Sequence, residues 1–170
     1  MRKSIPLFAV ILVLMVPALQ TSANEMNVEM GPDDMCQVKD LGVKFLCQKD
    51  WAIRPVDDAV LVIISAEPDV TLIVARIDSR IKFLSQLTNS FLETKERYAR
   101  GFRTERVKFA DREAIKVKAF AKDKPQKRLL DYYFINDSSL YGVLFSVKPK
   151  EDTDDYKFLF QDIIDRFEFI

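Results

Sequence analysis

The stretch from Lys127 to Lys148, KRLLDYYFINDSSLYGVLFSVK, constrains the fold more than any other part of the chain. Two apolar runs flank a polar turn at Asn136–Ser139, which predicts a β-hairpin. Both runs are apolar on both faces, with Asp131 and Ser146 as the interruptions. Strands of this kind lie in the middle of a sheet and need cover above and below. The glycine in the second strand, Gly142, indicates close approach of a helix or an aromatic ring.

Two further pairs of strands are predicted before this hairpin. Ala59–Ser65 and Val70–Ile77 are apolar on both faces and are joined by a segment that contains Pro68, so we expect two more central strands. Phe102–Phe109 and Glu113–Ala121 alternate instead between apolar and polar residues. This pattern is typical of strands at or near a sheet edge, where lysines also discourage edge-to-edge association.

Two helices are predicted from the spacing of apolar residues. One extends from Leu84 to Arg100, with Gly101 in the position of a helix-terminating glycine, and the other from Asp152 to Phe167. Acidic residues in the first turn of the second helix offset the positive end of the helix dipole, which explains them without a metal ion. The predicted fold class is therefore α+β, with a mostly antiparallel central sheet covered by helices on both faces (an α/β/α sandwich).

The amino-terminal residues 1–23 have the features of a Sec signal peptide. Arg2 and Lys3 precede an apolar run from Ile5 to Leu19, and small residues follow up to Ala23. The run is shorter than the ~20 residues needed to span a bilayer, and no cysteine lies at the cleavage point. We therefore expect cleavage after Ala23, in preference to an uncleaved anchor. The mature protein is then periplasmic or extracellular, is not a lipoprotein and has no transmembrane segment.

The mature chain is expected to contain one domain. Residues 24–35 are polar and lack periodicity, which indicates a flexible N-terminal tail. Residues 36–170 follow without a linker and are numerous enough to build a single hydrophobic core.

The two cysteines of the chain, Cys36 and Cys47, are expected to form a structural disulfide. The expected compartment favours disulfides, and the sequence Asp-Leu-Gly at 40–42 predicts a hairpin turn between them. If residues 41 and 42 form a two-residue loop, the two cysteines face each other across the ladder. A redox-active or metal-binding pair is the alternative.

Residue types that support common chemistries are missing from the sequence. The chain has no histidine, which excludes Ser-His-Asp and Cys-His nucleophile systems and imidazole metal sites. Its four glycines are too scattered for a phosphate-binding loop or a dinucleotide fingerprint. We therefore expect no catalytic residue, cofactor or metal ion. Paired carboxylates at Asp57–Asp58 and Glu151–Asp155 leave open a carboxylate-only hydrolase acting on envelope glycans, or a calcium site, although solvated turns and helix capping explain them more simply.

Several segments resemble the PsbP-like and Mog-like α/β/α sandwich superfamily. The segments that carry the resemblance are GVKFLCQKDWAI at 42–53, FADREAIKVKA at 109–119, YYFINDSSLYGVLFSV at 132–147 and IIDRFEF at 163–169. The resemblance implies an α/β/α sandwich in a bacterial envelope member of the superfamily. It also implies binding without catalysis, since members include an extrinsic subunit of the photosystem II oxygen-evolving complex, a Ran-binding protein and bacterial envelope proteins.

The charge of the chain is unevenly distributed. Removal of residues 1–23 leaves 24 basic and 26 acidic residues, a net charge of −2 that argues against a general nucleic-acid binder. Residues 100–128 nevertheless hold eleven basic and four acidic residues, a net charge of +7. If their hairpin turns at residues 110 and 111, Arg103 faces Lys118 and Glu105 faces Lys116 on one solvent face. The candidate binding surface consists of Arg103, Arg106, Lys108, Lys116, Lys118, Lys122 and Lys124.

The leading interpretation is a secreted, non-catalytic binding or accessory protein of the cell envelope. Protection of a sheet edge is the favoured explanation of Lys116 and Lys118 and needs no partner. It explains the loop lysines Lys122, Lys124 and Lys127 less well, so we also hypothesise that the basic hairpin docks an acidic protein or an anionic envelope surface, and not nucleic acid. The carboxylate-only hydrolase and a purely structural envelope component are the alternatives.

Overall fold

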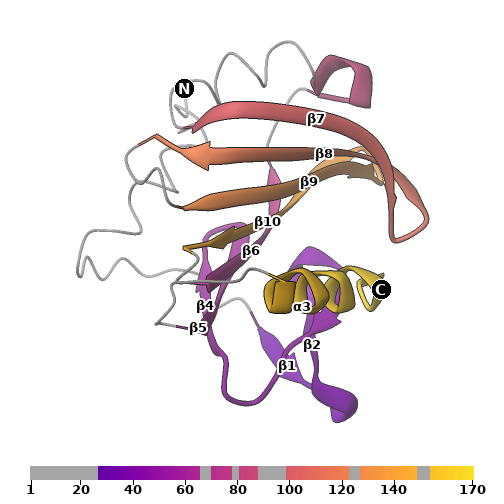
Figure 1. The fold of residues 1–170 in the computed structure, drawn as a ribbon. Helices are drawn as coiled ribbons and strands as arrows, with labels where there is room; N and C mark the ends of the chain where they lie inside the picture. The colour runs from indigo at the N-terminus through magenta and orange to yellow at the C-terminus, as the bar shows by residue number, and fades with distance from the viewer. Residues whose placement is uncertain (1–26, 66–69, 78–80, 88–98, 123–126, 149–153) are drawn as a thin grey trace.

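The computed structural model describes residues 27–65, 70–77, 81–87, 99–122, 127–148 and 154–170. Their strands form a seven-stranded sheet in the order β4-β5-β6-β10-β9-β8-β7 and a four-stranded sheet in the order β1-β2-β3-β11 (Figure 1). The larger sheet consists of β4 (Ala52–Val56), β5 (Ala59–Ser65), β6 (Val70–Ile77), β7 (Ala99–Phe109), β8 (Arg112–Ala121), β9 (Arg128–Asn136) and β10 (Ser139–Val147). The smaller sheet consists of β1 (Val28–Met30), β2 (Met35–Val38), β3 (Val43–Leu46) and β11 (Glu168–Phe169). The remaining elements are the 3-10 helices η1 (Pro32–Asp34) and η2 (Lys39–Leu41), the helix α3 (Asp154–Asp165) and a helical turn at residues 84–87.

The predicted central hairpin is confirmed. Strands β9 and β10 pair antiparallel in the middle of the seven-stranded sheet, and β6 pairs with the other side of β10. The hairpin turns at Asp137 and Ser138, which both have positive φ angles, as a type I′ turn requires. A Cβ atom added to Gly142 would lie 3.3 Å from the ring of Tyr133. The predicted approach of an aromatic ring to this glycine is therefore present.

One face of the larger sheet, here called the inner face, shares a hydrophobic core with α3 and the smaller sheet. In α3, Phe160 packs in a tilted arrangement against Phe145 of β10, with ring centroids 4.4 Å apart. Phe109 lies 4.9 Å from Phe134, and Phe167, which follows α3, contacts both rings. Since these aromatic side chains come from β7, β9, β10 and the end of the chain, the core joins segments that are distant in sequence.

The opposite face of the larger sheet, the outer face, carries a smaller cluster. Its buried members are Leu87, Ile115, Val117, Tyr133, Leu140 and Leu144. Leu87 belongs to the helical turn at 84–87, so the described residues show one helical turn on this face and the full helix α3 on the other. The predicted sheet is therefore present, while the predicted covering of both faces by helices is not shown.

The carboxyl end of the predicted helix 84–100 is wrong. Ala99 and Arg100 are the first residues of β7, and residues 88–98 lie outside the described part of the chain. Gly101 does not terminate a helix but lies in a β-bulge, where its φ angle is 67° and the pairing with β8 shifts. Glycines with positive φ occur both at the ends of helices and in β-bulges, so the presence of Gly101 alone did not distinguish the two.

The smaller sheet as a whole was not predicted, although its β2–β3 pair is the hairpin expected between the two cysteines. Strand β1 pairs with β2, so part of the expected flexible tail at 24–35 is a strand, while the predicted signal peptide lies outside the described residues. Helix α3 ends at Asp165, and Glu168 and Phe169, next to the predicted helix end at Phe167, pair with β3 as β11. Among the described residues, no helix has the length and apolar character needed to cross a membrane.

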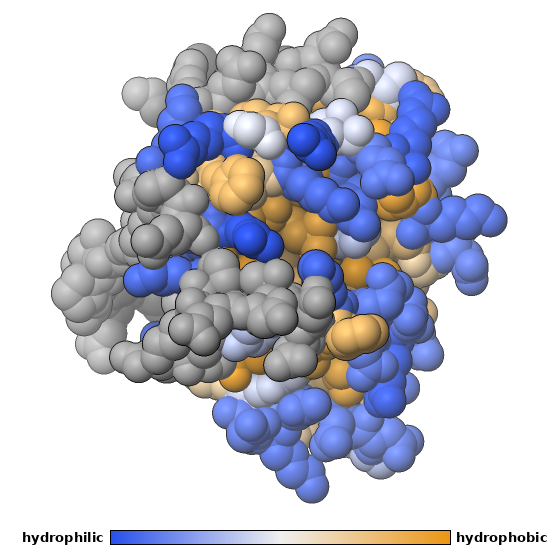
Figure 2. All heavy atoms as spheres, viewed as in Figure 1, coloured by the Kyte–Doolittle hydropathy of each residue, from blue (hydrophilic) through white to orange (hydrophobic). Residues whose placement is uncertain are grey.

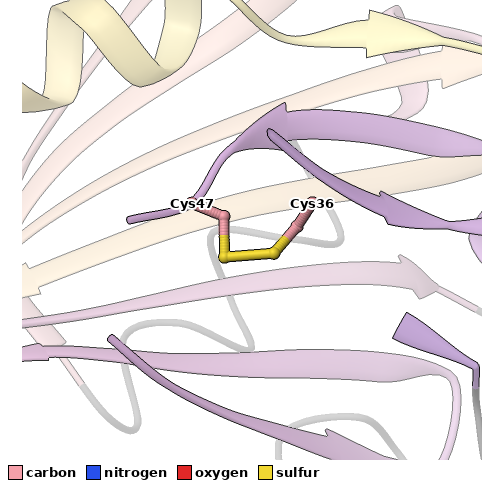
Figure 3. The surroundings of a disulfide bond; sticks show 2 residues. All are labelled: Cys36 and Cys47. Atoms are coloured by element: carbon pink, nitrogen blue, oxygen red, sulfur yellow. A yellow bond between two sulfur atoms is a disulfide. The ribbon is translucent and has the colours of Figure 1, made fainter. Parts of the chain in front are cut away.

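Cys36 and Cys47 form a disulfide, with their Cα atoms 5.3 Å apart (Figure 3). The predicted direct pairing of the two residues is wrong, because Cys36 faces Phe45 and Cys47 follows the end of β3. Leu41 is buried and cannot occupy an exposed two-residue loop, so the chain turns through η2 and a left-handed Gly42. Both cysteines are fully buried, which favours the structural disulfide over a redox or metal pair.

Candidate binding surface

The hairpin that carries the basic residues has the predicted register. Arg103 faces Lys118 and Glu105 faces Lys116 across β7 and β8. The turn consists of Ala110 and Asp111, with φ angles of 46° and 61°. A two-residue loop with positive φ at both positions is a type I′ turn, whose twist matches that of the flanking strands. The turn therefore sets the register of the hairpin from Phe109 back to Arg103, where the bulge at Gly101 changes it.

Three of the predicted site residues lie together on the inner face. The Lys116 ammonium is 5.4 Å from the ring centroid of Tyr132, which belongs to the inner core. Because side chains alternate along a strand, Lys118 is on the same face, and the pairing places Arg103 and Glu105 there as well. Arg103, Lys116 and Lys118, here called the inner cation group, thus extend past the edge of the inner core.

The other predicted site residues are not part of this group. Arg106 faces Ile115 and Lys108 faces Glu113, which places both basic side chains on the outer face. Lys122 follows the end of β8, and Lys124 lies outside the described residues. The structure therefore divides the predicted surface between the two faces of the sheet.

Apolar side chains adjoin the inner cation group, and sequence reasoning based on charge did not include them. Lys118 faces Leu130 of β9, which packs against the inner core, and Phe120, two residues further along β8, is 42% exposed. Figure 2 shows hydrophobic surface between the strands β7–β9 and α3, with hydrophilic residues on both sides of it. The alternation of Lys116, Lys118 and Phe120 on one side of β8 was the signal in the sequence that could have indicated this mixed surface.

Tyr132, below Lys116, is held in its neutral form. Burial and, second, the negative charge of Glu105 raise the pKa of Tyr132 to about 12. Burial also raises the pKa of Tyr133, on the outer face, well above its usual value. Independently of this shift, the electron-rich face of the Tyr132 ring attracts the Lys116 ammonium that lies over it.

The paired carboxylates singled out in the sequence do not form a shared site in the described structure. Asp57 and Asp58 form the turn between β4 and β5, and Asp58 accepts a 3.3 Å hydrogen bond from Arg76. Residues 151–153 of the second acidic cluster lie outside the described part of the chain. Within the described residues, no group of three or more carboxylates and thiols is arranged to hold a metal ion.

No family model and no curated protein matches the sequence. Among solved structures, the chain is similar to the solution structure of cyanobacterial PsbP (CyanoP) from Synechocystis sp. PCC 6803, with a TM-score of 0.56 and 15% sequence identity. The match covers 91% of this chain and 99% of that one. At this identity the similarity concerns the fold, and the resemblance inferred from the sequence is confirmed at that level: the chain has a PsbP-like fold.

Proposed function

We propose that this protein is a secreted, non-catalytic binding protein of the cell envelope that recognises an acidic protein partner. The inner cation group is the recognition surface. The observation that carries the proposal is the placement of Arg103, Lys116 and Lys118 on adjacent strands and on one face, with Glu105 as the acidic residue among them.

The like charges in this arrangement repel each other and destabilise the hairpin, and an acidic partner removes this repulsion. Directly opposite residues on paired strands have Cβ atoms about 4.5–5.5 Å apart, and like charges at this separation destabilise the sheet. Arg103 and Lys118 are such a pair. A carboxylate placed between them converts the repulsion into two favourable interactions, so binding of an acidic group stabilises the hairpin.

The shape of the sheet favours a protein partner over a flat anionic surface. Strands β7 and β8 curve, and their concave side is the side on which α3 lies (Figure 1). The inner cation group is on that same face, since Phe109 of β7 contacts Phe167 after α3. A planar membrane cannot follow a concave surface, whereas a protruding protein segment can enter it.

The proposed location is supported by the buried disulfide and by the amino-terminal sequence. Disulfides persist in oxidising compartments such as the periplasm, and Cys36–Cys47 is a fully buried bond. Residues 1–23 carry the basic, apolar and small-residue pattern of a Sec signal peptide. A PsbP-like fold is compatible with a binding role, although a fold alone does not assign a function.

A pull-down from the envelope fraction of the source organism tests the proposal. The mature protein is compared with a triple charge reversal, Arg103→Glu, Lys116→Glu and Lys118→Glu. A matched control reverses three exposed basic residues elsewhere, Lys49→Glu, Arg54→Glu and Lys148→Glu, and so changes the net charge equally.

We expect the unmodified protein to retain an acidic partner that high salt releases, because exposed charge pairs are screened. The control should retain the same partner, and the triple reversal should lose it while keeping the same far-UV circular dichroism spectrum. Retention by the triple reversal, or retention that does not depend on ionic strength, contradicts the proposed function.

A further inference from the structure

Strand β7 is the last strand of the seven-stranded sheet. Within the part of the chain that the structure describes, β7 pairs with β8 alone. It is 11 residues long, and most of its side chains are exposed. A long outer strand presents a row of backbone N–H and C=O groups that another extended chain can pair with.

The register identifies which backbone groups point outward. In a two-residue hairpin loop, the flanking residues Phe109 and Arg112 form a hydrogen-bonded pair, and hydrogen-bonded and non-hydrogen-bonded pairs then alternate along the strands. Thr104, Arg106 and Lys108 occupy the non-hydrogen-bonded positions. Their N–H and C=O groups are therefore directed away from β8, toward the outer edge of the sheet.

The charges of β7 lie on both of its faces. Arg103 is on the inner face beside Lys118, while Arg106 and Lys108 are on the outer face. A partner that contacts only the inner cation group leaves Arg106 and Lys108 without a role. A strand paired along the edge of β7 places its alternate side chains beside both faces, so acidic residues on such a strand reach all three cations.

The same charges select the occupant. A second copy of β7 brings like charges together across the new pair, which is unfavourable. An acidic strand forms opposite-charge pairs instead. The basic edge thus opposes self-association and favours an acidic partner strand.

We propose that an acidic segment of the partner protein binds as an additional strand along the outer edge of β7, hydrogen-bonded to the backbone of Thr104, Arg106 and Lys108. This inference rests on the proposed function, which requires an acidic partner but not this mode of binding. The bound strand extends the seven-stranded sheet by one, and its carboxylates lie beside Arg103 on the inner face and beside Arg106 and Lys108 on the outer face.

A proline at Thr104 removes one outward N–H group without removing a bond of the β7–β8 ladder, since proline is tolerated where the N–H faces solvent. Thr104→Val is the matched control, because it keeps the N–H group and removes only the hydroxyl. The probe is a synthetic peptide of about eight residues, rich in glutamate, valine and threonine and capped at both ends. A second peptide has the same sequence with N-methyl groups on alternate amides, which preserves its charge and blocks one edge.

Fluorescence anisotropy with the mature protein measures both peptides against each variant. We expect the plain peptide to bind the unmodified protein and Thr104→Val equally, and to bind Thr104→Pro about 5-fold or more weakly. N-methylation on the pairing edge should weaken binding to the unmodified protein to a similar extent.

The outcomes separate this inference from the proposed function. Equal, salt-sensitive binding of both peptides to all three proteins overturns edge pairing and leaves an acidic partner on the inner cation group. Absence of peptide binding also overturns edge pairing, and the pull-down then decides the proposed function by itself. Loss of the partner in the pull-down by the triple reversal, together with loss of the peptide by Thr104→Pro, supports both.

Discussion

Replacement of Gly142 by alanine tests how tightly the outer face of the sheet is packed. The new Cβ atom would lie 3.0 Å from Cδ1 of Leu144, 3.2 Å from Cδ1 of Ile77 and 3.3 Å from Cε1 of Tyr133. The φ angle of Gly142 is not in the positive region, so the strand accepts alanine without backbone strain and the effect is one of packing. Overpacking of a core costs ~1–3 kcal/mol, while alanine restricts the unfolded chain and returns ~0.4–1 kcal/mol. We expect a net loss of ~1 kcal/mol in the free energy of unfolding.

A double-mutant cycle identifies the side chain responsible. Ile77→Val removes the Cδ1 atom nearest to the new methyl group after that of Leu144, and by itself should cost ~0.5–1.5 kcal/mol. Gly142→Ala combined with Ile77→Val should cost less than the sum of the single changes by ~0.5 kcal/mol or more. Ile163→Val in α3, on the opposite face, is the control and should combine additively with Gly142→Ala.

Urea titration followed by circular dichroism measures the unmodified protein, the three single variants and the two double variants under one set of conditions, and equal slopes with denaturant indicate that the unfolded states are comparable. The reasoning is refuted if Gly142→Ala is as stable as the unmodified protein or more stable. If the effects of Gly142→Ala and Ile77→Val are additive, the close approach of the new Cβ atom to Cδ1 of Ile77 is not the cause of the destabilisation.

Two further predictions concern the disulfide and Tyr132. Replacing both Cys36 and Cys47 by alanine should lower the free energy of unfolding by ~3 kcal/mol from the entropy of the short loop alone, as measured by urea titration; two free thiols in protein recovered from its own compartment would contradict the bond. Because the folded protein raises the pKa of Tyr132 from 10.0 to about 12, the unfolded chain loses this proton first as the pH rises, so the contribution of the neutral phenol is constant below pH 10 and is lost between pH 10 and pH 12. The unmodified protein should therefore lose stability relative to Tyr132→Phe over that interval, and parallel pH dependence of the two proteins would rule out the shifted pKa.

Elements that depend on local patterns were predictable with their boundaries. Strands β5 and β6 have the bounds expected from their apolar runs, and the hairpins β7–β8 and β9–β10 turn where predicted. Period-two hydrophobicity and turn residues act over a few neighbouring positions, so the sequence contains the information directly. The pairing of Arg103 with Lys118 was also predictable, because the position of the turn fixes which residues lie opposite each other.

Elements that depend on competition between distant segments were not predictable. The start of β7 at Ala99 was assigned to a helix, because apolar spacing near a glycine suits a helix end as well as a strand with a bulge. Strand β11 was missed because two residues have no period of their own, and their pairing with β3 joins the two ends of the domain. In both cases the burial available in the folded molecule determines the local conformation.

The candidate site shows the same division. The basic composition of residues 100–128 and the disulfide partners could be inferred from the sequence. The sequence could not show that the inner cation group adjoins Leu130 and an exposed Phe120, or that strands β7 and β8 curve toward the side on which α3 lies (Figure 1).

By itself, the sequence determined the strands β5, β6, β8, β9 and β10, two of the turns, the cysteine pair and the absence of histidine chemistry, since each depends on residue type or on spacing within one segment. Only the tertiary structure decided the order of the strands, the second sheet and the division of the basic residues between two faces. Strand order is a nonlocal property. Every strand offers the same backbone N–H and C=O groups, so hydrogen bonding alone does not specify which strand pairs with which. The face that each side chain shares with the core follows only when that order is known.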